Sequence, residues 1–328
     1  MNILVTGGAG YVGSHAVKVL LAAGHSVTVY DNLSRGHHAA VPAGLLVVGE
    51  LSDQNKLTEL LRERRIEAVM HFAAFALVGE SVTDPALYYQ NNVVAALSLL
   101  EAMRAAQVSK FIFSSTTATY GEPATMPIAE DTLQQPINPY GFTKLVLEHA
   151  LADYAHAYGW GYAALRYFNA SGASPAGDIG EDHDPESHLI PIVLQVALGQ
   201  RESINIFGSD YPTPDGTCVR DYIHVDDLAS AHLKALEQLT PGVGLRLNLG
   251  TGTGHSVRQV IDACRRVTGH AIPERVGPRR AGDPPTLIAD SRLAQRTLAW
   301  QPKYVAIEEI VATAWAWHQS HPHGYAKS

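Results

Sequence analysis

The chain opens with Asn2-Ile3-Leu4-Val5-Thr6-Gly7-Gly8-Ala9-Gly10-Tyr11-Val12-Gly13, a β-rich run that leads directly into a glycine-rich loop. Glycines at 7, 10 and 13 permit a tight turn, close approach of the backbone to a pyrophosphate, and close packing of the next helix on the strand. The helix predicted over 13–23 would present its N-terminal N–H groups to a phosphate. Glycine triplets alone are weak evidence, but the flanking strand and helix are the context of a dinucleotide-binding loop.

The next predicted strand indicates which dinucleotide this is. It ends at Asp31, which lies 18 residues after Gly13, where an acidic residue hydrogen-bonds the adenosine ribose. A carboxylate at this position repels a 2′-phosphate, so NAD is favoured over NADP. Arg35 is the competing signal, because an arginine nearby could bind that phosphate, although a solvated loop charge explains it as well.

Beyond this loop, short β-rich runs alternate with helical patterns, which is typical of a parallel sheet covered by helices. Together with right-handed crossovers, this order predicts a doubly wound, Rossmann-type α/β fold. The predicted strands are 2–6, 26–30, 45–48, 68–71, 110–114 and 162–167, and the predicted helices are 13–23, 55–64, 86–106 and 140–158.

After about residue 170 the composition changes. The segment 170–186 is rich in Gly, Pro, Asp and Ser, as in a long functional loop. A helix at 189–198, a strand at 246–249 that returns to the sheet, and a helix at 256–267 follow. We therefore predict an NAD-binding domain over 1–169 with a returning segment near 220–265, and a smaller, discontinuous substrate-binding domain over 170–328.

Composition narrows the class of partner. The 328 residues are 46% hydrophobic and 17% charged, as in a folded protein, and the formal charge of −8 argues against nucleic acid. Two cysteines make no disulfide framework, and the apolar stretches are far shorter than the roughly 18 residues of a membrane-spanning helix. The first residues lack the features of a signal peptide. We expect a cytoplasmic protein with neither nucleic acid nor membrane as partner.

Two polar groups mark the candidate catalytic site. Tyr140 and Lys144 are spaced i, i+4 on a predicted helix, so a cation lies beside a phenol whose pKa must fall before it can act as a base. The strand at 110–114 ends in a run of hydroxyls that includes Thr116, at the edge where an open α/β sheet binds its ligand. Each pattern alone is common on helices and at strand ends. Their position downstream of the glycine loop favours a catalytic role.

These motifs carry a family resemblance. The glycine loop, the Ser-Ser-Thr…Tyr-Gly run over 114–121 and Tyr-x-x-x-Lys resemble the extended short-chain dehydrogenase/reductase superfamily. Within it the chain resembles the UDP-glucose 4-epimerases, which interconvert UDP-glucose and UDP-galactose through a transient 4-keto sugar with tightly bound NAD. The match covers nearly the whole chain, and its most specific segments are 207–213, 219–225 and 279–283.

The resemblance implies roles for individual residues. Tyr140 would be the general base and acid, Lys144 would lower its pKa and hold the nicotinamide ribose, and Thr116 would be the hydroxyl partner. The implied NAD contacts, besides these three and the loop glycines Gly7, Gly10 and Gly13, are Tyr11, Val12, Asp31, Asn32, Leu33, Ser34, Arg35, Gly36, Glu50, Leu51, Phe72, Ala73, Ala74, Phe75, Ala76, Asn91 and Phe168. The implied nucleotide-sugar contacts, besides Thr116 and Tyr140, are Asn169, His188, Leu189, Asn205, Ile206, Phe207, Arg220, Arg280, Asp283 and Leu287.

The sequence departs from the family pattern at two NAD contacts. Glu50 stands where the adenine-side acid is often Asp, and Ala76 stands where a lysine is frequent, so one ribose contact could be missing. Leu287 lies four residues after Asp283, where a bulky aromatic obstructs 2-acetamido sugars in similar epimerases. An epimerase acting mainly on UDP-N-acetylglucosamine or a UDP-pentose is therefore the alternative to one that serves galactose metabolism.

Other enzyme classes share parts of this pattern. A 4,6-dehydratase needs a further acid/base pair, and Thr117-Ala118 stand where similar dehydratases have Asp-Glu. A non-catalytic NAD sensor has no need of both Tyr140 and Lys144, and a plain alcohol dehydrogenase would release NADH. The apolar residues on more than one face of the helices at 86–106 and 140–158 favour a homodimer. His318, His321 and His323 lie in a polar tail, and we expect a solvated terminus and no metal.

Overall fold

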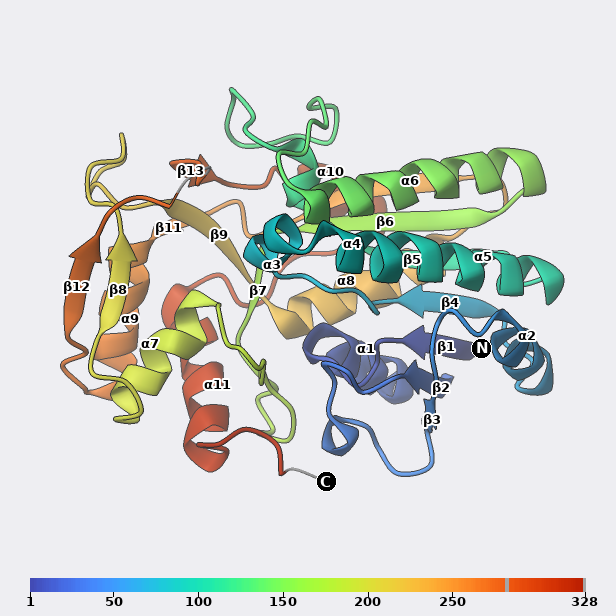
Figure 1. Ribbon diagram of the computed structural model, residues 1–328, viewed down its shortest axis with the longest axis horizontal. Coiled ribbons are helices and arrows are strands. Elements are labelled where there is room, and N and C mark those ends of the chain that lie inside the picture. Colours follow the sequence, from blue (N-terminus) through green and yellow to red (C-terminus); the bar gives the residue numbers. More distant parts are fainter. Residues whose placement is uncertain (281–282, 327–328) are drawn as a thin grey trace.

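The computed structural model describes residues 1–280 and 283–326, and within them seven parallel strands form the main sheet in the order β10-β6-β5-β4-β1-β2-β3. This confirms the doubly wound, Rossmann-type fold (Figure 1). The strands are β1 (Asn2–Thr6), β2 (Ser26–Asp31), β3 (Leu46–Val48), β4 (Ala68–His71), β5 (Lys110–Thr116), β6 (Gly161–Tyr167) and β10 (Gly244–Leu249).

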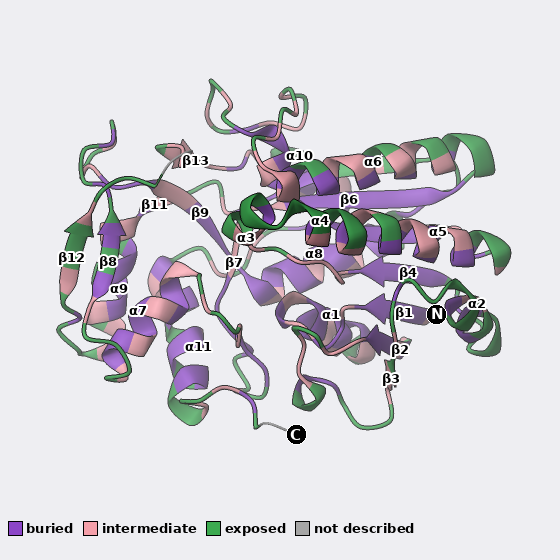
Figure 2. Cartoon of the chain, viewed as in Figure 1, coloured by how far each residue is buried: buried purple, intermediate pink, exposed green. Residues whose placement is uncertain are grey.

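Helices cover both faces of this sheet because its strands alternate apolar side chains between two cores. In β1, Ile3 and Val5 belong to one buried cluster and Leu4 to the other. The first face carries α1 (Tyr11–Ala22), α8 (Val225–Gln238) and α10 (Arg292–Leu298). The second carries α2 (Gln54–Glu63), α5 (Ala95–Ala105) and α6 (Pro139–Tyr158). Figure 2 shows the central strands buried between helices whose outer faces are exposed.

The second half of the chain builds a smaller body around its own apolar cluster. The helices α7 (Leu189–Ala197), α9 (Val257–Thr268) and α11 (Ile307–Ser320) pack together there, beside the two-stranded sheet of β8 (Ile204–Phe207) and β12 (Glu274–Gly277). Another small sheet centres on β9, which pairs with β7, β11 and β13; these are β9 (Val219–His224), β7 (Asn169–Ser171), β11 (Gly254–Ser256) and β13 (Thr286–Leu287).

The chain returns to the large sheet after residue 170 in more than one piece. The helix α8 packs on α1, and β10 extends the sheet beside β6. Residues of α10 then pack against β10 and α8, whereas α9, at the end of the expected returning segment, packs with α7 and α11. The division of the chain into two domains at residue 169 stays a prediction.

The predicted helix at 86–106 is wrong in one respect, because it is not one regular helix. It is α4 (Pro85–Tyr88), then a π-helical turn η2 (Tyr89–Val94), then α5, and it follows the short helix α3 (Val78–Thr83). Apolar spacing cannot reveal a π-turn, which inserts one residue without disturbing the general helical pattern. Residues 1–280 and 283–326 also contain two short 3₁₀ segments, η1 (His38–Ala40) and η3 (Thr117–Tyr120). Within the described residues, no helix is both long and apolar enough to cross a bilayer.

Candidate active site

The glycine loop joins β1 to α1 and is shaped by contacts that exclude side chains. Gly7 has φ +73°, and a Cβ there would lie 2.3 Å from the backbone nitrogen of Ala73. A Cβ on Gly13 would lie 2.1 Å from the carbonyl oxygen of Gly7. Gly10 differs, since a Cβ would meet only the Gly7 oxygen, at 3.4 Å. Gly7 and Gly13 therefore hold the turn together, and Gly10 leaves open the space in front of the helix.

The N-terminus of α1 is suited to an anion. Its N-cap is Gly10, which has no side chain to occupy the first N–H groups, and its first turn holds no acidic residue. These N–H groups have no partner within the helix and carry the positive end of the dipole. The helix starts at Tyr11, whose hydroxyl donates to the carbonyl of Gly172 at 2.6 Å and ties α1 to the loop after β7. The expected pyrophosphate position is thus built from backbone.

Asp31 supports the loop as well as offering an acceptor. Its carboxylate accepts hydrogen bonds from the backbone N–H of Ala9 at 3.0 Å and of Leu33 at 2.9 Å, one on each oxygen. Burial raises the pKa of Asp31, and these two donors lower it. Each oxygen keeps a second lone pair for a ribose hydroxyl.

The guanidinium of Arg35, which could have bound the 2′-phosphate of NADP, is engaged in other contacts. Its guanidinium pairs with Glu80 at 2.7 Å, donates to the carbonyl of Asp184 at 3.0 Å, and lies 5.4 Å from the centre of the Phe75 ring. It therefore bridges α3 and the loop before α7. On the adenine side, the Asn32 amide donates to the exposed Glu50 carboxylate at 3.0 Å, so the longer arm of Glu50 reaches the segment 32–36.

The loop after β4 is fixed by a residue that was not singled out from the sequence. Buried Asn92, in the π-turn, accepts from the N–H of Phe75 and donates to its carbonyl, both at 2.9 Å. The same amide donates to Thr143 of α6 at 3.3 Å. Asn92 thereby holds the predicted NAD contacts over 72–76 in register with the helix that carries the candidate base. Its neighbour Asn91, a predicted contact, donates its side-chain amide to Oδ1 of Asn92 at 2.9 Å; Ala76 is exposed.

A glycine also sets the position of Tyr140. Asn138 caps α6 by accepting from the N–H of Gly141 at 2.9 Å. A Cβ on Gly141 would lie 2.5 Å from the carbonyl oxygen of Ala118 in η3, so only glycine lets the first turn of α6 approach the end of β5 this closely. Thr116 caps η3 with its hydroxyl, which also lies close enough to the Tyr140 phenol to lower its pKa. The structure thus brings these two predicted catalytic groups together.

Lys144 lies beside the same strand end. Its ammonium donates to the carbonyl of Ser114 at 2.8 Å and lies 5.9 Å from the centre of the Tyr140 ring. Burial lowers the pKa of Lys144 to about 7, while nearby Glu148 raises it. Burial raises the pKa of Tyr140 above its usual value, and the nearby Thr116 hydroxyl offsets part of this rise. The role of Lys144 in lowering the pKa of Tyr140 stays a prediction.

A buried ion pair, also missed from the sequence, supports this strand end. Glu148 of α6 and Arg166 of β6 are each about 1% exposed, and the guanidinium Nε donates to the carboxylate at 2.9 Å. Ser115 donates its hydroxyl to the same carboxylate. Removing one partner of such a pair would leave a buried charge uncompensated.

The remaining predicted nucleotide-sugar contacts lie on other elements than Tyr140, Thr116 and Lys144. Asn205 and Phe207 are on the exposed face of β8, and Arg280 lies 4.0 Å above the Phe207 ring. The side chain of Ile206 is buried in the core of the second half, so it offers a ligand only backbone atoms. Arg220 of β9 forms an ion pair with Asp283. Ala281 and Gly282, which complete the segment 279–283, lie outside the described residues.

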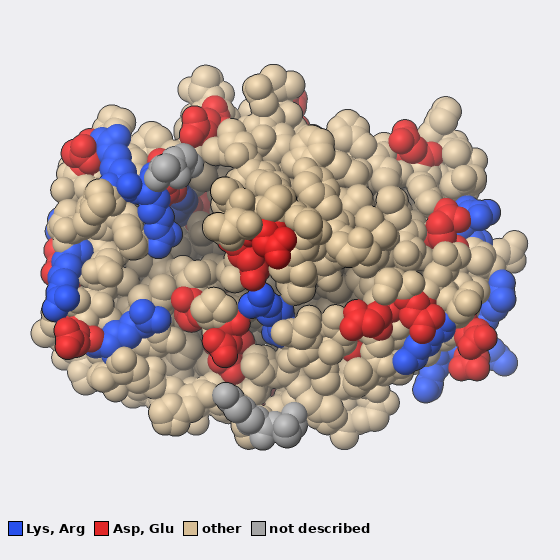
Figure 3. Space-filling model, viewed as in Figure 1, with Lys and Arg blue, Asp and Glu red and all other residues tan. Residues whose placement is uncertain are grey.

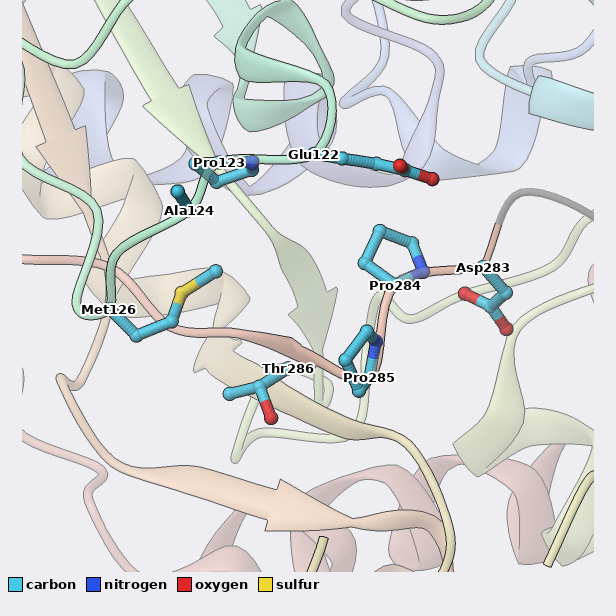
Figure 4. Close-up of a pocket in the computed structure, with 8 residues that line it drawn as sticks. All are labelled: Glu122, Pro123, Ala124, Met126, Asp283, Pro284, Pro285 and Thr286. Carbon is cyan, nitrogen blue, oxygen red and sulfur yellow. The ribbon is translucent and has the colours of Figure 1, made fainter. Parts of the chain in front are cut away.

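A pocket of about 290 Å³ adjoins Asp283. Figure 4 shows the segment Glu122–Met126, which follows η3, facing Asp283–Thr286 across it. The half-buried Leu287 follows directly in β13 and pairs with Arg220 of β9. Nearer the cofactor loop, the amide of Asn169 donates to the carbonyl of Asp221 at 3.0 Å, and Phe168 is half-buried beside it.

His188 belongs to a charged cluster. It is the N-cap of α7, before Leu189, and its Nδ1 lies 2.8 Å from Glu181 and 3.1 Å from Glu186. These carboxylates raise the pKa of His188 to about 10. His318 was expected in a solvated tail, which is wrong: it is buried in α11, where the apolar face of the helix packs. Burial lowers the pKa of His318, and Glu181 and Glu186 raise it.

A parallel sheet with a phosphate-binding glycine loop and a Tyr-x-x-x-Lys pair beside a strand-end hydroxyl define a nicotinamide-nucleotide enzyme of the short-chain dehydrogenase/reductase type. The sequence model of the "NAD dependent epimerase/dehydratase family" matches residues 3–250. The chain belongs to this family.

Individual relatives are similar over nearly their whole length. The UDP-glucose 4-epimerase of Halalkalibacterium halodurans is 55% identical over 327 residues, 99% of this chain and 98% of the relative. A crystal structure of UDP-glucose 4-epimerase from Brucella ovis in complex with NAD is 52% identical, with a TM-score of 0.92, over 96% of this chain and 97% of that one. A UDP-glucose-4-epimerase structure from Stenotrophomonas maltophila, with bound NAD and formylated UDP-arabinopyranose, is 42% identical, with a TM-score of 0.95, over 98% and 99%.

Proposed function

We propose that this chain is an NAD-dependent UDP-glucose 4-epimerase, an isomerase that interconverts UDP-glucose and UDP-galactose in galactose metabolism. The observation that carries the proposal is the juxtaposition of Tyr140, Thr116 and Lys144 at the carboxyl edge of a dinucleotide-binding sheet. Full-length similarity to UDP-glucose 4-epimerases supports the same activity.

The residues present fit NAD. Gly10 leaves space before the N-terminus of α1, where backbone N–H groups can bind the pyrophosphate. Asp31 keeps lone pairs for the ribose hydroxyls, and Arg35 is already paired with Glu80, which supports NAD over NADP. Bound there, NAD would supply a reversible hydride acceptor for C4 of the sugar.

Tyr140 would move the proton that accompanies each hydride step. Its phenolate takes the proton of the sugar 4-hydroxyl as the alcohol becomes a ketone, and the phenol returns a proton when the ketone is reduced. Burial raises the pKa of Tyr140, and the Thr116 hydroxyl opposes this rise, in the direction that the phenolate requires. Lys144, fixed by the Ser114 carbonyl, would hold the nicotinamide ribose next to the base.

Epimerisation further requires a firmly held UDP and a sugar that can turn over. Arg220 and Arg280 are forked cations suited to a pyrophosphate, and Arg220 is already oriented by Asp283. The proposed UDP contacts thus lie on β8, β9 and the segment before β13, apart from the base on α6. A sugar anchored only through its phosphate can present either face of C4 to Tyr140.

The dehydratase alternative receives no support from the residues after Thr116. Thr117 and Ala118 carry no acid, and the Thr117 hydroxyl donates to the carbonyl of Tyr167 at 3.3 Å. The alternative substrates, UDP-N-acetylglucosamine and UDP-pentoses, depend on the size of the sugar pocket. We propose Leu287 as the residue that restricts it, because it pairs with Arg220 of β9 and directly follows Thr286, which lines the pocket beside Asp283.

We also propose a cytoplasmic homodimer. Tyr89, Val94 and Phe142 are 40–47% exposed on η2 and α6, and the rings of Tyr89 and Phe142 lie 6.4 Å apart. Figure 3 shows few charged side chains over the middle of α4, α5 and α6, whereas Lys and Arg gather over the β8–β12 side. An uncharged surface with large apolar side chains suits a helical interface between copies.

Release of the cofactor tests the proposal. Because the mechanism regenerates NAD, the protein purified without added nucleotide should retain it, and heat denaturation should release NAD into the supernatant. Chromatography against standards identifies the nucleotide. Finding NADP, or activity that depends wholly on added cofactor, would count against the proposal.

A further inference from the structure

The loop between β7 and α7 gathers four side chains that share one centre. Glu181, His183, Glu186 and His188 each direct one donor atom inward, and all four atoms lie within 4.8 Å of one another. The Nδ1 atom of His188 lies 2.8 Å from Glu181 and 3.1 Å from Glu186. The Nδ1 atom of His183 lies 3.2 Å from Glu181 and 3.8 Å from Glu186.

These separations match the edges of a tetrahedron around a small dication. Zinc bonds to imidazole nitrogen and carboxylate oxygen are about 2.0–2.1 Å long, which places tetrahedral donor atoms roughly 3.3 Å apart. The two imidazole nitrogens lie 2.8 and 3.2 Å from Oε1 of Glu181, and 3.1 and 3.8 Å from Oε1 and Oε2 of Glu186, on both sides of this value. Rotation of the side chains suffices to close the remaining gaps.

Burial adds an independent argument. The side chains of Glu181 and Glu186 are only 4% and 5% exposed. Two neighbouring carboxylates withdrawn from water require matching positive charge, which is supplied either by protonated His183 and His188 or by a bound dication. The backbone after Glu186 also orients its carboxylate, because Oε1 accepts from the N–H groups of Ser187 at 2.7 Å and His188 at 2.8 Å. The side chains of His183 and His188 are 29% and 39% exposed, so an ion could reach the four side chains from solvent.

The donor set selects the kind of metal. Two imidazole nitrogens disfavour Mg²⁺ and Ca²⁺, which prefer oxygen ligands alone, and favour zinc and its neighbours in the first transition series. Two carboxylates neutralise a dication. Four protein ligands leave no open position, as in a structural rather than a catalytic site.

The surroundings show what such an ion would hold in place. Between the ligands, Asp182 accepts from His37 through its carbonyl at 2.8 Å and from the N–H of Tyr325 through its carboxylate at 2.8 Å. Asp184 accepts from Arg35, and the His183 ring lies 6.1 Å from Tyr11, edge to face. The loop therefore connects the proposed NAD contacts at Tyr11 and Arg35 to the C-terminal segment.

We propose that Glu181, His183, Glu186 and His188 form a structural site for a divalent transition metal, Zn²⁺ in the first place, which fixes this loop against the cofactor-binding half. The expectation of no metal weighed only the C-terminal histidines and overlooked the spacing Glu-x-His-x-x-Glu-x-His in the loop. The site shares His188 with the predicted nucleotide-sugar contacts but includes none of Tyr140, Thr116 and Lys144, and it does not depend on the proposed epimerase activity.

The test uses the full chain without an affinity tag. The protein is dialysed against a chelator, incubated with excess Zn²⁺, freed of unbound ion by gel filtration and analysed by mass spectrometry for zinc. We expect one zinc per chain, a higher midpoint of thermal unfolding with Zn²⁺ than without, and a tetrahedral visible spectrum when Co²⁺ replaces it. Excess Mg²⁺ should not displace the ion.

His183→Gln and Glu186→Gln should each lower Zn²⁺ affinity by at least about tenfold, since even outer-shell changes have effects of this size. The exposed His323→Gln is the matched control and should keep one zinc per chain. Circular dichroism and bound nucleotide report whether each variant is folded. Wild-type protein that retains no zinc after loading, unchanged affinity in both ligand variants, or loss of zinc in the control would overturn the proposal. The wild-type result decides the matter should the ligand variants fail to fold.

Discussion

Replacing Gly141 with alanine should separate the candidate base from its hydroxyl partner without touching either. The added methyl would lie 2.5 Å from the carbonyl oxygen of Ala118 and 3.1 Å from the Cβ of Pro136. Ordinary contact begins at 3.4 Å, so the first turn of α6 has to retreat from η3 by about 0.9 Å. Tyr140 is the residue immediately before Gly141, and Thr116 caps η3, so the retreat opens the gap between them.

This displacement sets the size of the effect. A misplacement of about 1 Å in a reacting group can cost about 100-fold in rate, which corresponds to about 2.7 kcal/mol of activation free energy. Overpacking at such a contact typically lowers the free energy of unfolding by about 1–3 kcal/mol. The protein should therefore stay folded, retain its nucleotide, and lose kcat far more than it loses affinity for UDP.

The assay compares kcat for UDP-galactose, thermal unfolding and UDP affinity for wild type, Gly141→Ala and Gly79→Ala. Gly79 is the control, because it lies in the helix α3 with nothing within 4 Å of an added Cβ. A helical glycine-to-alanine change in open space should stabilise by about 0.5–1 kcal/mol and leave kcat unchanged. Wild-type kcat in Gly141→Ala would refute the argument that the approach of α6 to η3 positions the base.

Two other substitutions separate the chemistry from the choice of sugar. Tyr140→Phe should lower turnover of UDP-galactose by about 10²–10⁴-fold, as for loss of a general acid/base, with UDP affinity by calorimetry almost unchanged; near wild-type turnover would mean that another group is the base. Leu287→Tyr should abolish the weak turnover expected with UDP-N-acetylglucosamine and spare UDP-glucose and UDP-galactose. If the ratio of these activities in initial-rate assays does not change, Leu287 does not restrict the pocket.

The sequence was sufficient for the sheet because its central strands are short runs with apolar cores, Ile3–Val5 and Ala68–Met70. The strands at 2–6 and 68–71 were predicted with the bounds they have. The irregular elements were harder to predict from the sequence. The π-turn at Tyr89–Val94 keeps the apolar spacing of a helix, while Asn92 within it contacts Phe75. Such a contact joins residues 17 apart in the chain, and nothing in their spacing reveals it.

At the site, the sequence indicated which groups matter but not how they are held. Tyr140 and Thr116 were singled out, whereas the closeness of Gly141 to Ala118 and the buried pair of Glu148 and Arg166 emerged only in three dimensions. The spacing of Tyr140 and Lys144 on a helix also does not show that the cation is buried, and this burial lowers the pKa of Lys144 to about 7.

The most direct test of the proposed activity is to incubate the purified protein with UDP-galactose, with no added NAD, and to analyse the nucleotide sugars by chromatography and mass spectrometry. We expect UDP-glucose to form until the two sugars reach equilibrium, with the mass of the nucleotide sugar unchanged and no NADH released. Loss of one water from the sugar, accumulation of free NADH, or no conversion until NAD is added would contradict an epimerase that retains and regenerates its cofactor.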